Sequence, residues 1–301
     1  MLLRNADGVG VSGRRRAQTP HPGVGCITNR CDSCFSGYGY PMTRTVFISG
    51  AAQGIGRATA QRLAGRGWSV GAYDISDNFD WATGPNLHTG HLDVTDPEGW
   101  ENALSEFAQA VGGHIDVVVN NAGILYGGPF VTEGSYKKDA ALVDVNVKGV
   151  LFGARAAYPW LQKSPDARLV NIASAAAIYG TPDMAVYSTT KFAVRGITEA
   201  LDQEWDQDDI TVTSLWPLYA KTGMLDGVET SGTKPMGVSL SAEDIAEAIT
   251  KVVEAPRSKP TKVHHPVGRQ AKIMYLASHF SPNWLLRFIN AKLTTDRKVR
   301  F

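Results

Sequence analysis

Short runs of β-branched and apolar residues alternate along the chain with longer stretches in which apolar residues recur at helical spacing. A short apolar run bounded by turn residues is typical of a buried strand, whereas a spacing of three or four residues is typical of a helix with one packed face. The expected strands are 45–49, 68–73, 87–92, 115–119, 168–172 and 210–215, and the expected helices are 57–66, a stretch from about 95, 135–161 and a stretch through 187 to about 205. Strands that alternate with helices predict one α/β domain over residues 42–301, a doubly wound parallel sheet with helices on both faces.

The first expected strand runs directly into Gly50-Ala51-Ala52-Gln53-Gly54-Ile55-Gly56, and a helix-like stretch follows. Strand, glycine turn and helix in this order are the context of a dinucleotide site. Glycines let the backbone turn and approach a pyrophosphate, and the start of the helix offers unpaired N–H groups to its charge. We therefore expect a cofactor site beyond the carboxyl ends of the strands. The glycine spacing is G-x-x-x-G-x-G rather than the commoner G-x-G-x-x-G.

The second expected strand ends at Asp74, which predicts the choice of cofactor. A carboxylate at this position accepts hydrogen bonds from the hydroxyls of an adenosine ribose and repels a 2′-phosphate. No Arg or Lys stands in the glycine turn or directly after Asp74 to bind that phosphate. The residues favour NAD over NADP.

Tyr187 and Lys191 are four positions apart on an expected helix, so their side chains leave the same face. A phenol has a pKa of about 10, and a neighbouring ammonium is expected to lower it toward the range that acid–base catalysis needs. Ser174 precedes Tyr187 by thirteen residues. Taken alone, a Tyr and a Lys at this spacing are more typical of a partly buried phenol and a solvated ammonium, so the pair needs support from the rest of the chain.

The charge is unevenly distributed over the 301 residues, although the net charge is only +1. Residues 254–301 hold ten Lys and Arg but only Glu254 and Asp296 as acids, and Trp284, Leu285, Leu286, Phe288 and Ile289 lie among them. Such a basic and apolar tail fits the surface of an anionic membrane. The tail can also pack on its own domain or on a partner subunit, and this is the interpretation that we favour. Nucleic acid is disfavoured as a partner because the rest of the chain is acidic.

Residues 1–41 are rich in Gly, Arg, Pro and Ser and show no sustained period. They are expected to be a disordered extension or a mis-assigned start, with Met42 as the true first residue. Cys26, Cys31 and Cys34 all fall in this stretch, and with His21 as the nearest fourth ligand we expect no metal site. No apolar run reaches the length of a spanning helix and no secretory signal is evident, so a cytoplasmic protein is expected.

Several motifs stand in the order of one known family. The chain resembles the short-chain dehydrogenase/reductase family, a group with a Rossmann-type fold, from about Met42 to its end. The motifs that carry the resemblance are Ser49-Gly50 with Gly54-Ile55-Gly56, Asn120-Asn121-Ala122-Gly123, Asn146, Ser174, and Tyr187 with Lys191. Ser49 stands where Thr is usual, and Pro217-Leu218 replaces the common Pro-Gly after the last expected strand.

The resemblance implies a catalytic set. Tyr187 would exchange a proton with the substrate oxygen, Lys191 would lower the Tyr187 pKa and hold the nicotinamide ribose, Ser174 would hydrogen-bond the substrate oxygen, and Asn146 would hold a water. The implied cofactor-binding residues are Gly50, Gln53, Gly54, Ile55, Asp74, Asp93, Val94, Asn120, Ala122, Gly123, Tyr187, Lys191, Pro217 and Thr222. A homodimer or homotetramer is implied as well.

The expected substrate pocket is apolar. Besides Ser174 and Tyr187, the candidate lining residues are Leu125, Tyr126, Tyr179, Met184 and Leu218, under a lid over 223–240. They suggest a steroid, terpenoid or fatty-chain alcohol or ketone, unless they only pack the core. Two alternatives stand beside this alcohol dehydrogenase: an acyl-thioester ketoreductase, and a catalytically idle NAD-binding sensor or scaffold. The intact Asn146, Ser174, Tyr187 and Lys191 set favours an enzyme.

Overall fold

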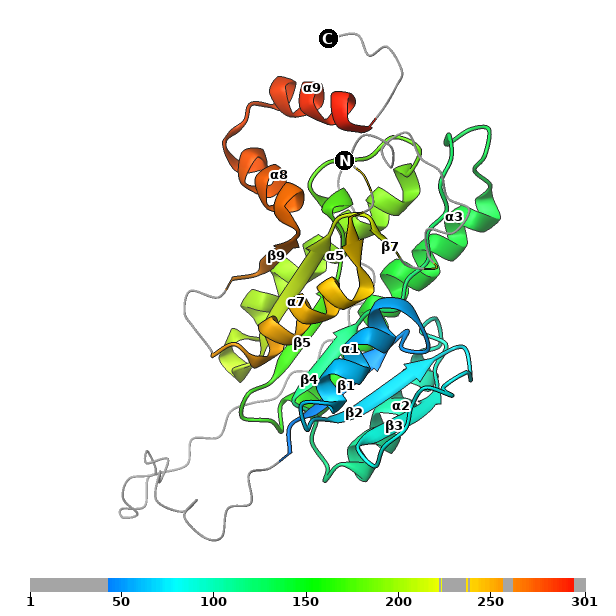
Figure 1. Ribbon diagram of the computed structural model, residues 1–301, viewed down its shortest axis with the longest axis vertical. Coiled ribbons are helices and arrows are strands. Elements are labelled where there is room, and N and C mark those ends of the chain that lie inside the picture. The colour runs from blue at the N-terminus through cyan, green and yellow to red at the C-terminus, as the bar shows by residue number, and fades with distance from the viewer. Residues whose placement is uncertain (1–42, 222, 224–236, 238, 257–261, 295–301) are drawn as a thin grey trace, which may run out of the picture. The chain divides into compact units, whose positions relative to one another are not determined.

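The computed structural model describes residues 43–221, 223, 237, 239–256 and 262–294 (Figure 1). The expected extension 1–41, most of the expected lid and Thr222 lie outside these residues. In the described part, no helix is long and apolar enough to cross a membrane.

Seven strands form one parallel sheet in the order β3-β2-β1-β4-β5-β6-β9. Their bounds are Thr45–Ser49 (β1), Ser69–Asp74 (β2), Leu87–His91 (β3), Val117–Asn120 (β4), Arg168–Ile172 (β5), Thr211–Pro217 (β6) and His264–Val267 (β9). The three central strands β1, β4 and β5 are buried at every position, as near-continuous apolar runs require when both faces of a sheet are covered. The expected doubly wound sheet is confirmed.

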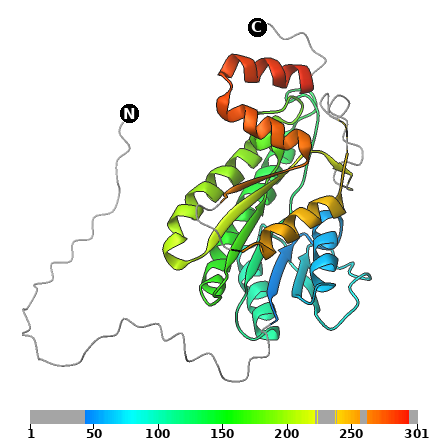
Figure 2. The same cartoon turned by 60° about the vertical axis from the view of Figure 1, so that its left-hand side comes forward.

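Helices cover both faces of this sheet (Figure 2). Helices α2 (Pro97–Ala110), α4 (Gly149–Leu161) and α5 (Ala185–Glu204) pack on one face around Phe47, Trp100 and Phe107. Helices α1 (Gly54–Ala64) and α7 (Ala242–Glu254) pack on the other. The described residues also include α3 (Tyr136–Val143), α8 (Arg269–Phe280), α9 (Asn283–Thr294) and the two-stranded pair β7 (Ala220–Lys221) with β8 (Leu240–Ser241).

Most expected elements are found, with shifted ends. Helix α1 begins at Gly54 rather than 57, so its first turn is part of the glycine loop. The long helical stretch 135–161 is interrupted by one π-helical turn, Asp144–Lys148, which separates α3 from α4. Strand β6 continues two residues beyond the expected end, to Pro217. The shifts of α1 and β6 lie at the ends of these elements, where local pattern carries least information.

Strand β9, with the sequence His-His-Pro-Val, was not expected. It lies at the edge of the sheet and pairs only with β6, which tolerates a proline because one side of an edge strand makes no ladder bonds. Helices α8 and α9 follow it and lie at the end of the molecule where the strands have their carboxyl ends (Figures 1 and 2).

The order of strands reverses between β1 and β4. In open α/β sheets, ligands bind outside the carboxyl ends of the strands at such a switch point. The glycine loop follows β1, and Asn121-Ala122-Gly123 follows β4, so the topology brings both motifs to this crevice.

Candidate active site

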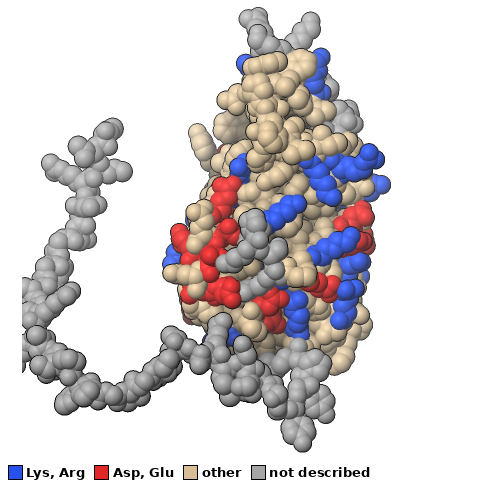
Figure 3. Space-filling view, turned by 90° about the vertical axis from the view of Figure 1, so that its left-hand side faces the viewer, with Lys and Arg blue, Asp and Glu red and all other residues tan. Residues whose placement is uncertain are grey.

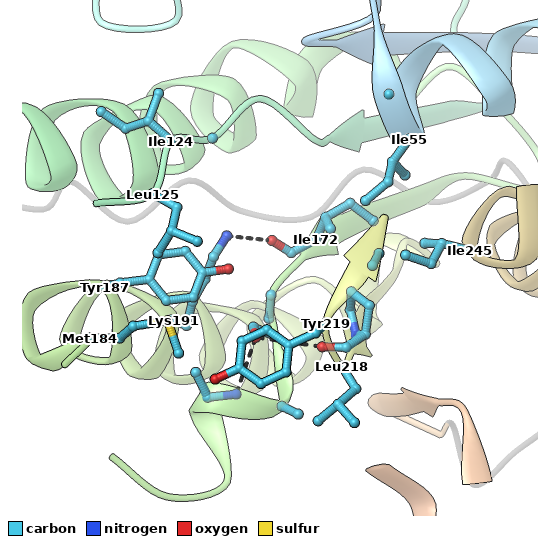
Figure 4. Close-up of a pocket in the computed structure, with 18 of the residues that line it drawn as sticks. Ile55, Ile124, Leu125, Ile172, Met184, Tyr187, Lys191, Leu218, Tyr219 and Ile245 are labelled. Atoms are coloured by element: carbon cyan, nitrogen blue, oxygen red, sulfur yellow. Dashed lines mark hydrogen bonds between the residues drawn. The ribbon is translucent and has the colours of Figure 1, made fainter. Parts of the chain in front are cut away.

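A cavity of about 540 Å³ lies at this crevice and extends over the ends of β5 and β6 to helix α5 (Figure 4). One end is lined by the glycine loop and Asp74, and the other by Ser174, Tyr187 and Lys191. Ile55, Ile172 and Ile245 lie on one side of the close-up, whereas Tyr187, Met184 and Leu125 lie on the other. One continuous pocket therefore joins the nucleotide motif to the Tyr–Lys pair.

The glycine loop is shaped so that other residues cannot replace its glycines. Gly50 has φ +68°, and a Cβ there would stand 2.6 Å from Cα of Ala122. A Cβ on Gly56 would stand 2.2 Å from the carbonyl oxygen of Gly50. Gln53 precedes α1 without a side-chain cap, so the N–H groups of the first turn stay available to an anion in the cavity. The loop fits a pyrophosphate on geometric grounds.

Asn121 and Ser49 fasten the loops after β1 and β4 to each other. The amide of Asn121 donates to the carbonyl oxygens of Ser49 and Gly50, at 2.9 and 2.8 Å. The Ser49 hydroxyl accepts from the backbone N–H groups of Asn121 and Ala122, at 3.2 and 3.3 Å. Ser therefore supplies the hydroxyl that the usual Thr would supply.

Asp74 lies at the carboxyl end of β2, beside the glycine loop. Its Oδ2 accepts from the backbone N–H of Ala52 at 2.9 Å, and its Oδ1 accepts from the N–H of Ser76 at 3.0 Å. These bonds hold the carboxylate against the cavity that it lines. A negative charge is thus fixed at one end of the site.

Tyr187 and Lys191 lie one turn apart on α5, as expected, with the Lys191 Nζ 5.5 Å from the centre of the Tyr187 ring. The ammonium donates to the carbonyl oxygen of Ile172 at 2.9 Å, as the dashed line in Figure 4 marks. Lys191 is only 6% exposed. The alternative of a solvated Lys is therefore wrong.

The electrostatics of this pair differ from the sequence-based expectation. Burial raises the pKa of Tyr187 to about 12, and a hydrogen bond with Ser174 opposes the rise. Burial lowers the pKa of Lys191 to about 8. The expected lowering of the Tyr187 pKa by the ammonium is not found, because removal from water disfavours the charged form of both groups.

Asn146 sits in the π-helical turn and is buried. Its amide bridges the backbone of Ile124: Oδ1 accepts from the N–H at 2.8 Å and Nδ2 donates to the carbonyl oxygen at 2.9 Å. The same Nδ2 donates to the Thr190 hydroxyl on α5 at 3.2 Å. The side chain therefore ties the segment after β4 to the helix that carries Tyr187.

Most predicted site residues meet at the cavity. Those that line it are Gly50, Gln53, Gly54, Ile55, Asp74, Ala122, Gly123, Leu125, Tyr126, Ser174, Tyr179, Met184, Tyr187, Lys191, Pro217 and Leu218.

Four predicted residues do not line it. They are Asn146, Asn120, Asp93 and Val94. Asn120 is buried and donates to Oδ1 of Asn171 at 2.9 Å. Asp93 accepts from the N–H of Thr95 at 2.9 Å, and the Val94 side chain packs in the core. Their cofactor roles stay predictions.

Sequence reasoning missed several lining residues. Tyr219 places a further phenol in the cavity, next to Leu218 (Figure 4). Met274 of α8 and Asn290 and Thr294 of α9 line it from the end of the chain. No motif marks these three positions, and only the path of the chain after β9 brings them to the site.

Comparisons with known proteins identify a family and several relatives of this chain. A family model described as short chain dehydrogenase matches residues 44–232. The chain is 34% identical over 235 residues to L-2,3-butanediol dehydrogenase of Corynebacterium glutamicum, covering 74% of this chain and 89% of that protein. It is 34% identical over 189 residues to a 3-alpha-(or 20-beta)-hydroxysteroid dehydrogenase of Mycobacterium tuberculosis, covering 62% of this chain and 72% of that protein.

Solved structures share the fold. A short chain dehydrogenase from Burkholderia cenocepacia in complex with NADP superposes with a TM-score of 0.72 at 22% identity, covering 84% of this chain and 98% of that one. A 3-ketoacyl-(acyl-carrier-protein) reductase from Brucella melitensis complexed with NADH superposes with a TM-score of 0.69 at 27% identity, covering 74% and 96%. Since the family match spans more than half of the chain, the protein belongs to the short-chain dehydrogenase/reductase family of oxidoreductases.

Proposed function

We propose that the protein is an NAD-dependent oxidoreductase that interconverts a secondary alcohol and a ketone, with Tyr187 as the general acid and base. The observation that carries the proposal is the single cavity in which Ser174, Tyr187 and Lys191 face the far end of a glycine-rich nucleotide loop. An idle NAD-binding protein needs the loop and Asp74 but not the buried Tyr–Lys pair.

The residues of the cavity fit a nicotinamide dinucleotide. Gly50 and Gly56 leave no room for a Cβ, the first turn of α1 presents unpaired N–H groups, and Asp74 suits ribose hydroxyls. When bound, the cofactor supplies or accepts the hydride. The fixed charge of Asp74 disfavours a 2′-phosphate, and this supports NAD. The similar structures carry either NADP or NADH in their complexes.

Tyr187 moves the proton. In ketone reduction its hydroxyl gives a proton to the substrate oxygen, and in alcohol oxidation the phenolate takes one up. A pKa of about 12 keeps the phenol protonated at neutral pH, which is the form that reduction consumes. Ser174 hydrogen-bonds the same oxygen as charge develops, and the Lys191 ammonium stabilises the phenolate that forms.

The substrate half of the cavity is largely apolar. Leu125 and Met184 lie beside Tyr187, and Leu218 lies beside Tyr219 (Figure 4). Tyr179 and Met274 are also in the lining. Pockets of this kind bury apolar ligands and use few polar groups for orientation. One relative is named for hydroxysteroids, and this supports our proposal of an apolar secondary alcohol or ketone such as a steroid, terpenoid or fatty-chain compound. Another relative is named for a small diol, which shares with these compounds only the secondary alcohol.

The test follows NADH and NADPH absorbance against a panel of steroid, terpenoid and aliphatic secondary alcohols and their ketones. Tyr187→Phe should lower turnover by a factor of about 10² to 10⁴ while NADH still binds. Tyr219→Phe removes another phenol of the cavity, one that acts electrostatically on Tyr187, and is the matched control, which should keep most of the activity. Loss of activity in Tyr219→Phe with retention in Tyr187→Phe would move the acid to Tyr219.

The panel includes an acyl thioester, because the similar reductase from Brucella melitensis is named for such a substrate. Turnover of the thioester alone would favour a ketoreductase. Tight NADH binding without turnover of any compound would favour the sensor. The expected homodimer or homotetramer and the cytoplasmic location stay predictions.

A further inference from the structure

Helices α8 and α9 form the end of the molecule beyond the carboxyl ends of the strands (Figures 1 and 2). Helix α8 is held by Tyr275, whose ring packs edge-on against Trp216 at 5.4 Å between centroids. Helix α9 is held by Asn290, whose amide donates to the carbonyl oxygen of Gly180 at 3.2 Å. Ala271 and Thr294 are also buried. One side of each helix is therefore anchored to the domain.

The other side of both helices presents large apolar side chains to the surroundings. On α8, Ile273, Leu276 and Phe280 are spaced by three and four residues and share one helix face. On α9, Trp284 and Phe288 are spaced by four. Phe280 is 82% exposed and Trp284 69% exposed. We call these five residues the α8–α9 face.

The charges around the α8–α9 face have a single sign. The sequence contains no Asp or Glu between Glu254 and Asp296. Exposed Arg269 and Lys272 lie on α8, and exposed Arg287 and Lys292 lie on α9. In Figure 3 the end of the molecule formed by these helices is tan with blue margins, while the red side chains gather on the lower body. The face is thus apolar in its middle and cationic around it.

The same two helices also wall the cavity. Met274, Asn290 and Thr294 line it from the inward side. A second, neighbouring groove between α9 and the start of α5 shares Tyr179, Thr181 and Asn290 with the first cavity. The two helices that carry the α8–α9 face therefore also form part of the wall of the candidate active site.

We propose that the α8–α9 face binds the surface of an anionic lipid bilayer, with both helices lying in the plane of the interface. Apolar and aromatic side chains then enter the boundary between headgroups and acyl chains, and Lys and Arg contact anionic headgroups. Neither helix spans the bilayer, in agreement with their length of twelve residues each.

A second copy of this chain suits the face less well. A two-fold symmetric contact brings the same patch of both subunits together. The cationic patch that includes Arg269, Lys272 and Lys292 would then lie against the same patch of the other copy, and neither helix carries a carboxylate to offset the repulsion. An anionic bilayer instead offers the opposite charge and an apolar layer together.

The first experiment is flotation of the whole protein with vesicles of phosphatidylcholine and with vesicles that also contain phosphatidylserine. We expect the protein to float with the anionic vesicles, weakly with the neutral ones, and less as salt is raised. The double variant Phe280→Ser/Trp284→Ser should lose most of the binding. The matched control Val131→Ser/Tyr136→Ser removes an equally exposed apolar pair outside the face, with Tyr136 at 96% exposure, and should bind like the wild type.

Two single lysine substitutions, one on the α8–α9 helices and one elsewhere, complete the test. Lys272→Gln should weaken binding to the anionic vesicles about fivefold, and Lys163→Gln on the loop after α4 should not. Equal binding to neutral and anionic vesicles would overturn the anionic preference. Absence of flotation would overturn the proposal. If the Phe280→Ser/Trp284→Ser variant then differed from the wild type in oligomeric state, the face would be assigned to contact with a second copy. None of these readouts depends on the proposed oxidoreductase activity.

Discussion

At the scale of single residues, Asp74 has two separable properties, its charge and its hydrogen bonds. Its carboxylate accepts from Ala52 and Ser76, so Asp74→Ala would disturb the loop as well as remove the charge. Asp74→Asn keeps an acceptor oxygen for one of these two bonds and is the sharper variant. We expect it to weaken NAD binding about tenfold and to relax the discrimination against NADP, because the repulsion of a 2′-phosphate is lost.

Isothermal titration of Asp74→Asn with NADH and NADPH measures both effects, with a thermal melt to check that the fold is retained. Unchanged affinity for both cofactors in a folded variant would remove Asp74 from the discrimination between them.

Lys191 predicts a particular pH dependence of stability. Its folded-state pKa of about 8 lies below its ordinary value of 10.5, so between these pH values the unfolded chain binds more protons than the folded one. The cost of burying the ammonium is complete below pH 8 and is relieved as pH rises. The unfolding free energy of the wild type should therefore rise with pH in this range, by at most about 1.4 kcal/mol per pH unit. Lys191→Met should not show this rise.

Urea unfolding at pH 7 to 9 measures this slope, below the pKa of about 10 at which a tyrosine titrates in the unfolded chain. Lys163→Met, at an exposed position, should keep the wild-type slope. Parallel curves for the wild type and Lys191→Met would show that Lys191 carries no such shift.

At the scale of elements, the same substitution of glycine by alanine is expected to change stability in opposite directions in two helices. A Cβ on Gly153 of α4 would stand 2.3 Å from Oδ1 of Asn120 and 2.7 Å from the Trp100 ring, whereas Gly196 of α5 has nothing within 4 Å. Gly153→Ala should destabilise the protein by about 1–3 kcal/mol through overpacking. Gly196→Ala should stabilise it by about 0.5–1 kcal/mol, because alanine loses less backbone entropy in a helix.

Urea unfolding of both variants at one pH gives the comparison. A stabilised Gly153→Ala would mean that α4 can move away from β4, and that the close contact is not required for the fold.

At the scale of the whole molecule, the cavity joins segments from both ends of the described chain. The glycine loop comes from its beginning, and Asn290 comes from α9 near its end. Asn290→Ala removes the hydrogen bond to Gly180 and should raise the KM for the alcohol about three- to tenfold, with the Kd for NADH unchanged.

Asn283→Ala, at an exposed position on the first turn of α9, is the control and should behave like the wild type in steady-state kinetics. An equal loss of NADH affinity in Asn290→Ala would show that α9 supports the whole pocket and not its substrate half alone.

Local patterns in the sequence were sufficient to predict the sheet, the glycine loop, and the Tyr187–Lys191 pair. A buried strand, a turn that requires glycine and a pair one helical turn apart each depend on neighbouring residues, so their signals survive without the fold. The edge strand β9 has no such signal, because its His-His-Pro-Val sequence owes its pairing to β6 alone.

The pocket depended on contacts between distant segments. Met274, Asn290 and Thr294 reach the cavity only because β9 directs the chain back across the carboxyl ends of the strands. The pKa values of Tyr187 and Lys191 likewise follow from burial, which packing sets and the spacing of two residues does not. Neighbouring residues determine local backbone geometry. The burial of a side chain and the closure of a pocket depend on contacts between distant segments of the folded chain.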